Sequence, residues 1–150
     1  MDKINAEARH RNMAAIHSKE TKPEIEIRSA LHKLGFRFRK NDKRYPGTPD
    51  ILLPKYRACI FVNGCFWHGH NCRKNKKKPV TNVDFWREKI NKNIERDKKE
   101  IFALQQEGWR VGIVWECSII GKNRNEKVKD VADKLCYWLE ECPSEMLFEI

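Results

Sequence analysis

Residues 57–72 concentrate side chains that can bind a metal ion or transfer protons. An apolar run from Cys59 to Val62 ends at Asn63-Gly64, and two cysteines, two histidines and two large aromatic side chains follow directly. These are Cys65, Phe66, Trp67, His68, His70 and Cys72. We predict a strand that delivers its last residues into an active site, followed by a loop held by a metal ion.

Three soft ligands in this loop leave one vertex of a tetrahedral metal site open. They are Cys65, His70 and Cys72. Cys117 follows an apolar strand predicted for residues 109–115, so it is well placed to complete the set. Three cysteines and one histidine are typical of a closed, structural zinc site. His68 competes with His70 for the ligand position, and the alternative is that all these cysteines are buried free thiols.

An acidic side chain, Asp50, is brought to the same loop by the predicted strand pairing. Two apolar strands, 51–53 and 57–62, are separated by the tight turn Pro54-Lys55-Tyr56. Strands joined in this way pair antiparallel. Asp50, at the start of the first strand, should therefore lie near Val62, at the end of the second.

Two further acidic residues have two interpretations each. Asp97 falls on the apolar stripe of a helix predicted for residues 84–106, where an unpaired charge is costly. It forms either a core salt bridge or a pair with a histidine of the Cys/His loop. Glu24 follows Thr21 by three residues, which is typical of a capping box at a helix start. It also extends the apolar stripe of its helix, so it is either a cap, which we favour, or a carboxylate directed at the site.

Asp50 and His68 remain unassigned once the zinc set is removed, and together they suit phosphodiester hydrolysis. A carboxylate and a backbone carbonyl from a neighbouring strand can hold Mg2+ with several waters. The metal stabilises developing charge, and a nearby imidazole activates or orients water. The formal net charge of +10 favours a polyanionic partner, nucleic acid first and an anionic membrane second.

The remaining pattern predicts one α/β domain. Strands are expected at residues 36–40, 51–53, 57–62 and 109–115, and helices at 21–34, 84–106 and from 126 onward. We divide the chain into an N-terminal arm or helix (1–20), which either contacts DNA or packs on the surface, a main domain (21–143) and a peripheral C-terminal tail (144–150). No apolar run approaches the roughly 20 residues that span a bilayer. The polar N-terminus lacks the apolar core of a signal peptide, so we expect a cytoplasmic protein with reduced cysteines.

Taken together, these residues closely resemble the very-short-patch repair endonucleases of bacteria. The matching stretches are Arg11-Asn-Met-x-x-Ile16, Pro46-Gly-x-Pro-Asp50, Phe61-Val-Asn-Gly-Cys-Phe-Trp-His68, Phe85-Trp86, Asn93-Ile-Glu-Arg-Asp97 and Trp109-Arg-Val-x-Ile-Val-Trp-Glu-Cys117. The resemblance covers residues 9–140. It implies a restriction-endonuclease-like α/β fold, with a central mixed sheet flanked by helices and a structural zinc site. It also implies a Mg2+-dependent nick 5′ to the thymine of a T:G mismatch in double-stranded DNA, which starts repair of deaminated 5-methylcytosine.

By matching position, the resemblance assigns roles to individual residues. Asp50 and the Val62 carbonyl would bind Mg2+, and His68 would be the catalytic histidine. Glu24 and Asp97 would support the network of water and histidine. The zinc set falls on the four residues chosen above. An aromatic wedge would enter the base stack beside the mismatch from the major groove; it consists of Phe66, Trp67 and Trp86. Two apolar residues, Met13 and Ile16, would approach from the minor groove.

The expected enzyme is a monomer in the cytoplasm, associated with the nucleoid, with mismatch-repair proteins as possible partners. Asn63 departs from the family pattern because members carry a second histidine there, and an amide cannot transfer protons. His68 would then act alone. The histidine run after Trp67-His68 is also thinned, but the zinc ligand is retained. Two rival functions remain: a zinc-stapled DNA-binding module that recognises distortion without cutting, and a site-specific nickase acting on paired DNA.

Overall fold

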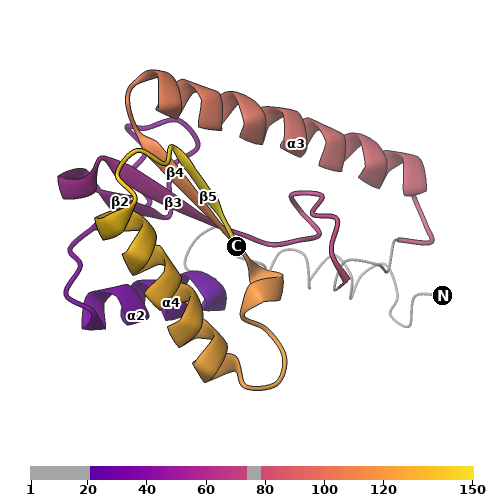
Figure 1. The fold of residues 1–150 in the computed structure, drawn as a ribbon. Coiled ribbons are helices and arrows are strands. Elements are labelled where there is room, and N and C mark those ends of the chain that lie inside the picture. The colour runs from indigo at the N-terminus through magenta and orange to yellow at the C-terminus, as the bar shows by residue number, and fades with distance from the viewer. Residues whose placement is uncertain (1–20, 74–78) are drawn as a thin grey trace.

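The computed structural model describes residues 21–73 and 79–150, which form a five-stranded mixed sheet flanked by helices (Figure 1). The strands, in their order across the sheet, are β1 (Arg39–Lys40), β2 (Ile51–Leu53), β3 (Ala58–Asn63), β4 (Arg110–Trp115) and β5 (Leu147–Glu149). The first three pair antiparallel, whereas β3, β4 and β5 pair parallel. The predicted α/β class with a mixed sheet is therefore confirmed, while the restriction-endonuclease-like assignment stays a prediction.

The connections between strands explain this pairing. β2 and β3 are joined by the single 3-10 turn η1 (Pro54–Tyr56), and Arg57 closes it in the left-handed region with φ 47°. Parallel neighbours need a longer crossover, usually a helix. The helices α3 (Val83–Gln106) and α4 (Arg124–Glu141) serve this purpose between β3 and β4 and between β4 and β5.

The helices lie on opposite faces of the sheet. α2 (Lys22–Lys33) and α4 pack on one face, and α3 lies over the other (Figure 1). Alternate residues of β2 follow this division: Ile51 and Leu53 pack with α2 and α4, whereas Leu52 packs with Leu104 of α3. Side chains alternate between faces because a strand is pleated. No helix in the two described ranges is long and apolar enough to cross a membrane.

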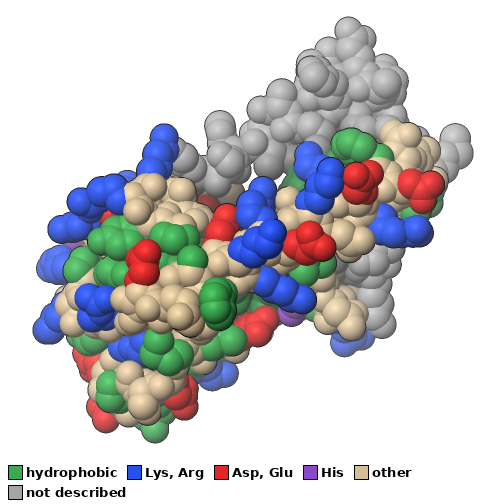
Figure 2. Space-filling model, turned by 90° about the horizontal axis from the view of Figure 1, so that it is seen from above, with side chains coloured by type: hydrophobic (Ala, Val, Ile, Leu, Met, Phe, Trp, Pro, Cys, Tyr) green, Lys and Arg blue, Asp and Glu red, His purple; other side chains and the backbone are tan. Residues whose placement is uncertain are grey.

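The predicted apolar stripe of α3 is mostly half-buried, and Leu104 is its fully buried member. Farther toward the N-terminus, the stripe contacts the Cys/His loop. A Cβ placed on Gly69, which has φ 64°, would lie 2.6 Å from Ile94 Cδ1 and 2.9 Å from Ile90 Cγ2. The N-terminal half of α3 therefore supports the loop more than the sheet. Its outer face carries interspersed basic and acidic side chains (Figure 2), as expected for a solvated surface.

Two predicted helix starts differ from the structure. Thr21 occupies the N-cap of α2, but its side chain makes no capping hydrogen bond, so the reciprocal capping box is not formed. The helix predicted from residue 84 begins at Val83, and Asn82, not Asp84, occupies the N-cap of α3, with φ 53°. Asp84 lies instead in the first turn, where a negative charge interacts favourably with the helix dipole.

Two predicted segments near the edges of the sheet also differ. The strand expected at 36–40 is confined to Arg39–Lys40, because Phe36 turns into the core with only 4% of its surface exposed. The tail expected to be peripheral supplies β5, which pairs parallel with β4. The predicted arm, including Met13 and Ile16, lies outside the described residues.

Candidate active site

Asp50 lies against the end of β3, as the strand pairing predicts. The Val62 backbone N–H donates a hydrogen bond of 2.7 Å to Asp50 Oδ2. The register places Ile51 opposite Ile60, so the residue before β2 reaches the last residues of β3. The prediction that Asp50 and Val62 are neighbours is confirmed, and the site therefore forms where these two strands meet the Cys/His loop.

Glu24 brings a second carboxylate to Asp50. It is buried, with 3% of its surface exposed, and Arg28 Nη2 lies 3.3 Å from Glu24 Oε2. Burial and then the charge of Glu24 raise the pKa of Asp50 from 3.8 to about 8, while the Val62 N–H and Arg28 act in the opposite direction. Glu24 thus faces the site, which is the interpretation that we favoured less from the sequence.

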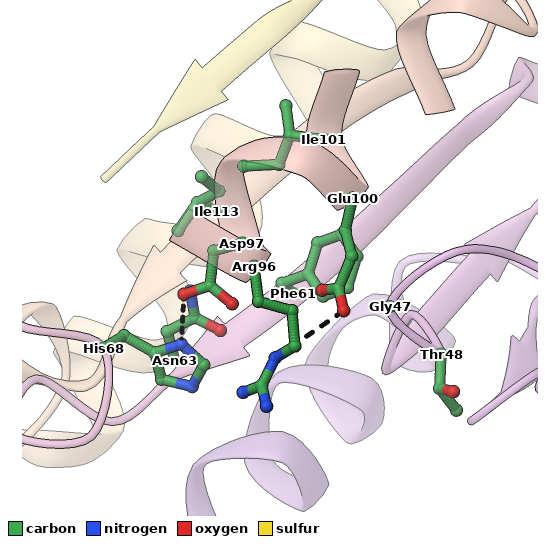
Figure 3. Close-up of a pocket in the computed structure, with 10 residues that line it drawn as sticks. All are labelled: Gly47, Thr48, Phe61, Asn63, His68, Arg96, Asp97, Glu100, Ile101 and Ile113. Atoms are coloured by element: carbon green, nitrogen blue, oxygen red, sulfur yellow. Dashed lines mark hydrogen bonds and ion pairs between the residues drawn. The ribbon is translucent and has the colours of Figure 1, made fainter. Parts of the chain in front are cut away.

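His68 is held by α3 from the other side of the site. Its Nδ1 lies 2.6 Å from Asp97 Oδ2, and both side chains are about three-quarters buried. Asn93, one turn earlier on the same helix, donates from Nδ2 to the Trp67 carbonyl oxygen at 2.8 Å. The prediction that Asp97 pairs with a histidine of the Cys/His loop is confirmed. Two side chains of α3 therefore fix the position of this loop, and Figure 3 shows the contact between Asp97 and His68.

Three adjoining hollows meet at Asn63 and His68, which line all of them. The Asp50 hollow, of about 430 Å³, is also lined by Glu24 and Asp50. The Asp97 hollow, of about 350 Å³, is lined by Asp97 and is drawn in Figure 3. The wedge hollow, of about 720 Å³, is lined by Phe66 and Trp67, among others. The carboxylates, the imidazole and the aromatic side chains thus line adjoining hollows that share Asn63 and His68.

Four side chains beside this space can hold a metal ion. They are Cys65, His70, Cys72 and Cys117, whose potential ligand atoms all lie within 4.8 Å of one another. The Cys117 Sγ to His70 Nδ1 distance is 3.6 Å. The His70 ring stacks on Trp115 at 4.0 Å with an interplanar angle of 3°. The predicted set of four is therefore assembled, with His70 as its imidazole, while His68 is engaged by Asp97.

The other three cysteines lie outside this cluster. Cys59 is fully buried in the sheet, and burial raises the pKa of its thiol to about 12. A thiol with such a pKa stays neutral and behaves as a small apolar core residue. Cys136 and Cys142 lie at the C-terminal end of α4 and pack against the core on that side of the sheet. Their positions indicate a role in packing.

The three predicted wedge residues form one aromatic cluster beside His68. Phe66 lies 5.2 Å from Trp67 and 5.4 Å from Trp86 between ring centroids, and the two tryptophans are 5.8 Å apart. All three contacts are edge-to-face, a favourable geometry for aromatic rings. Lys89 Nζ lies 5.7 Å from the Trp67 centroid and 5.8 Å from that of Trp86. The cluster is half-buried, although large aromatic side chains are usually placed in a core.

Known proteins are similar to this chain in sequence. The sequence model of the family described as "DNA mismatch endonuclease Vsr" matches residues 1–74. The DNA mismatch endonuclease Vsr of Escherichia coli (strain K12) is 45% identical over 133 residues, which are 87% of this chain and 83% of that protein. The chain belongs to the Vsr family.

Relatives within the Vsr family also carry other names. The type II nicking enzyme V.NmeAIP of Neisseria meningitidis serogroup A is 50% identical over 126 residues, covering 81% of this chain and 89% of that protein. The type II nicking enzyme V.XorIIP of Xanthomonas oryzae pv. oryzae is 47% identical over 118 residues, covering 79% and 86%. These names agree that the chain is an endonuclease.

Three residues of this Vsr-family site were not found from the sequence. Arg28 pairs with Glu24 at a spacing of four residues, which is the spacing of an ion pair on one helix face. Glu116 Oε1 accepts a hydrogen bond of 3.1 Å from the Cys65 backbone N–H, and its place directly before Cys117 is the available signal. Asn93 lies one turn before Asp97 on α3 and donates to the Trp67 carbonyl oxygen. The signal for Asn93 was a polar residue beside the apolar stripe of α3, four residues before Asp97.

Proposed function

We propose that this Vsr-family endonuclease nicks one strand of double-stranded DNA 5′ to the thymine of a T:G mismatch, with Mg2+ as its cofactor. The repair of deaminated 5-methylcytosine would start at this nick. The contact that carries the proposal is the His68–Asp97 pair, because it presents an oriented imidazole beside the buried carboxylate of Asp50. The name of the Escherichia coli relative supports the choice of a mismatch as substrate.

Asp50, with the Val62 carbonyl as a second ligand, is the proposed Mg2+ site. Hard oxygen ligands suit this ion. The residues present fit a cation, because two carboxylates lie together in a buried place and the pKa of Asp50 is raised there. A divalent ion would offset their mutual repulsion. When bound, it supplies electrostatic stabilisation of the charge that develops on the phosphate.

His68 is the proposed catalytic histidine. A carboxylate only accepts hydrogen bonds, so the 2.6 Å contact with Asp97 selects the form of His68 with its proton on Nδ1. Nε2 then carries a lone pair and can accept a proton from water as water attacks phosphorus and a bridging P–O bond breaks. Asn63 lines the same hollows but has no titratable proton, so His68 acts as the single imidazole.

Zinc is the proposed occupant of the Cys/His cluster, with a structural role. Three sulfur ligands and one imidazole are the donor set that Zn2+ prefers, and no position of a tetrahedron remains for substrate. Cys65 and Cys117 follow the ends of the adjacent parallel strands β3 and β4. The ion would therefore tie the loop to the sheet. Phe66, Trp67 and His68 lie between two of its ligands and would keep their geometry.

The aromatic cluster of Phe66, Trp67 and Trp86 is the proposed wedge that enters the base stack. Separating stacked bases costs a few kcal/mol, and the cost is least at a mismatch. This difference is a physical source of selectivity. Met13 and Ile16 are proposed to approach from the minor groove. We also propose a monomer in the cytoplasm that works at the nucleoid and contacts mismatch-repair proteins.

A site-specific nickase on paired DNA is the second candidate, because two relatives are named type II nicking enzymes. Membership of an endonuclease family argues against the module that binds without cutting. The deciding experiment is a nicking assay on matched and T:G-mismatched duplexes, with Mg2+ or with EDTA. We expect nicking of the mismatched duplex alone, and only with Mg2+. Equal cleavage of both duplexes would favour the paired-DNA nickase, and no cleavage of either would overturn the proposal.

A further inference from the structure

Arg96 points into the space beside His68 from α3. Its side chain is drawn in Figure 3 between His68 on one side and Gly47 and Thr48 on the other. It lines both the Asp97 hollow and the wedge hollow, and 59% of the side chain is exposed. An arginine that reaches two hollows from their shared boundary is accessible to a ligand in either of them.

Glu100 holds the inner end of the Arg96 side chain. Glu100 Oε1 lies 3.7 Å from Arg96 Nε, one helical turn along α3. The Glu100 carboxylate is three-quarters buried, and a Cβ placed on Gly47 would lie only 2.7 Å from Glu100 Oε2. Gly47, with φ 78°, therefore leaves room for this carboxylate. The contact uses Nε of the guanidinium, and Figure 3 shows the terminal Nη groups turned away from Glu100.

A positive side chain at this place would offset the negative charge of the acidic side chains and of a bound phosphodiester. Among the described residues, four acidic side chains line the Asp97 and Asp50 hollows around His68, namely Asp97, Glu100, Glu24 and Asp50, against two basic ones, Arg96 and Lys43. A phosphodiester brings another charge, and its transition state adds more. Hydrogen-bond donors that already point to where negative charge develops make a large contribution to catalysis. A guanidinium can donate two parallel N–H groups to the oxygens of one phosphate.

We propose that Arg96 contacts a non-bridging oxygen of the DNA phosphate that is attacked beside His68, with Glu100 as the residue that positions it. Other basic side chains line one hollow each in the described part of the site: Lys43 the Asp50 hollow and Lys89 the wedge hollow. Arg96 is the basic side chain that reaches two. The inference rests on the proposed nicking function and adds the group that stabilises phosphate charge.

The test separates binding from chemistry in four variants. Arg96→Ala, Arg96→Lys, Glu100→Gln and the double variant Arg96→Ala/Glu100→Gln are compared by single-turnover nicking at saturating enzyme with Mg2+. DNA binding is measured by fluorescence anisotropy with Ca2+ in place of Mg2+. We expect Arg96→Ala to slow nicking about 100-fold and to weaken binding by about tenfold or less. Arg96→Lys should restore part of the rate, because it restores charge without the planar fork.

The double variant distinguishes positioning from an independent effect. If Glu100 acts through Arg96, Glu100→Gln slows nicking by itself but adds nothing to Arg96→Ala. Lys98→Ala is the matched control, because it removes one charge from α3 about 200° around the helix from Arg96. Thermal unfolding monitors the fold, and an unaltered midpoint is expected for the exposed Arg96.

Two results would overturn the inference. Either Arg96→Ala nicks as fast as Lys98→Ala, or the effects of Arg96→Ala and Glu100→Gln are additive. Arg96→Lys keeps the inference testable if Arg96→Ala lowers the unfolding midpoint. Failure of the wild-type chain to nick with Mg2+ would instead refute the proposed function.

Discussion

Replacing Asp97 with asparagine isolates the contact that orients His68. The substitution keeps the size and shape of the side chain but removes its charge. Asp97 Oδ2 accepts a hydrogen bond from His68 Nδ1 at 2.6 Å, whereas an asparagine amide can also donate to Nδ1. Donation to Nδ1 would place the imidazole proton on Nε2. The nitrogen proposed to accept a proton from water would then be blocked in part of the molecules.

The size of the effect follows from the kind of hydrogen bond that is lost. A hydrogen bond to a charged group contributes about 1.5–3 kcal/mol. With about 1.4 kcal/mol for each factor of ten in rate, we expect nicking to slow about 10- to 150-fold. Population of the wrong tautomer moves the result toward the upper end. The unfolding midpoint should also fall, because the contact is present in the folded protein and both side chains are about three-quarters buried.

Single-turnover nicking of a T:G duplex with Mg2+ measures the effect, with DNA binding measured separately in Ca2+. We expect the loss in the rate constant and not in the affinity. Glu95→Gln is the matched control, because it changes a carboxylate to an amide at an exposed position of the same helix. A rate for Asp97→Asn within about threefold of Glu95→Gln would refute the assignment of Asp97 to orienting the proposed catalytic histidine.

Three further predictions concern the metal sites and the wedge. Asp50→Asn should abolish nicking and keep DNA binding. In the wild type, the pKa of Asp50 is raised to about 8 in the folded state, so ionisation of Asp50 lowers the free energy of unfolding as pH rises from about 4 to about 8. At pH 8 in EDTA the variant should therefore unfold at least about 2 °C higher than the wild type, and a lower midpoint would contradict this reasoning. Phe66→Ala with Trp67→Ala should remove the preference for T:G over matched DNA, as seen from the ratio of nicking rates; an unchanged ratio would mean that the cluster is ordinary packing. Elemental analysis should find about one zinc per wild-type chain and clearly less in Cys117→Ser, and little zinc in the wild type would reject the proposed occupant.

Much of the site could be predicted because its parts follow from local patterns. The tight turn between two apolar strands places Asp50 at Val62, and this needs only the rule for antiparallel neighbours. The spacing along α3 places Asp97 on its inner face, where a buried charge requires a partner. The Cys/His cluster was predicted from ligand chemistry and from the end of a second strand. Each of these inferences uses one element and one physical rule.

The parts that were not predicted depend on contacts between elements. Thr21 and Glu24 match a capping pattern locally, but the burial of Glu24 against Asp50 depends on how α2 packs on the sheet. β5 is three residues long, and its pairing with β4 is specified by α4, which brings the chain back. The stripe of α3 predicts an inward face without showing that its first half meets a loop. Arg96 and Glu100 were not singled out from the sequence for the same reason.

The position of Cys117 has a consequence for the order in which the molecule assembles. The loop contains three of the four soft side chains, but the fourth comes only after α3 and β4 have been added to the chain. With zinc at this cluster, tight capture of the ion would wait until β3 and β4 pair in the correct parallel register. A chain with a shifted register would lack the full set of ligands, and its wedge and histidine would not be held. Metal occupancy would then report that the sheet is correctly built before the nuclease can act on DNA.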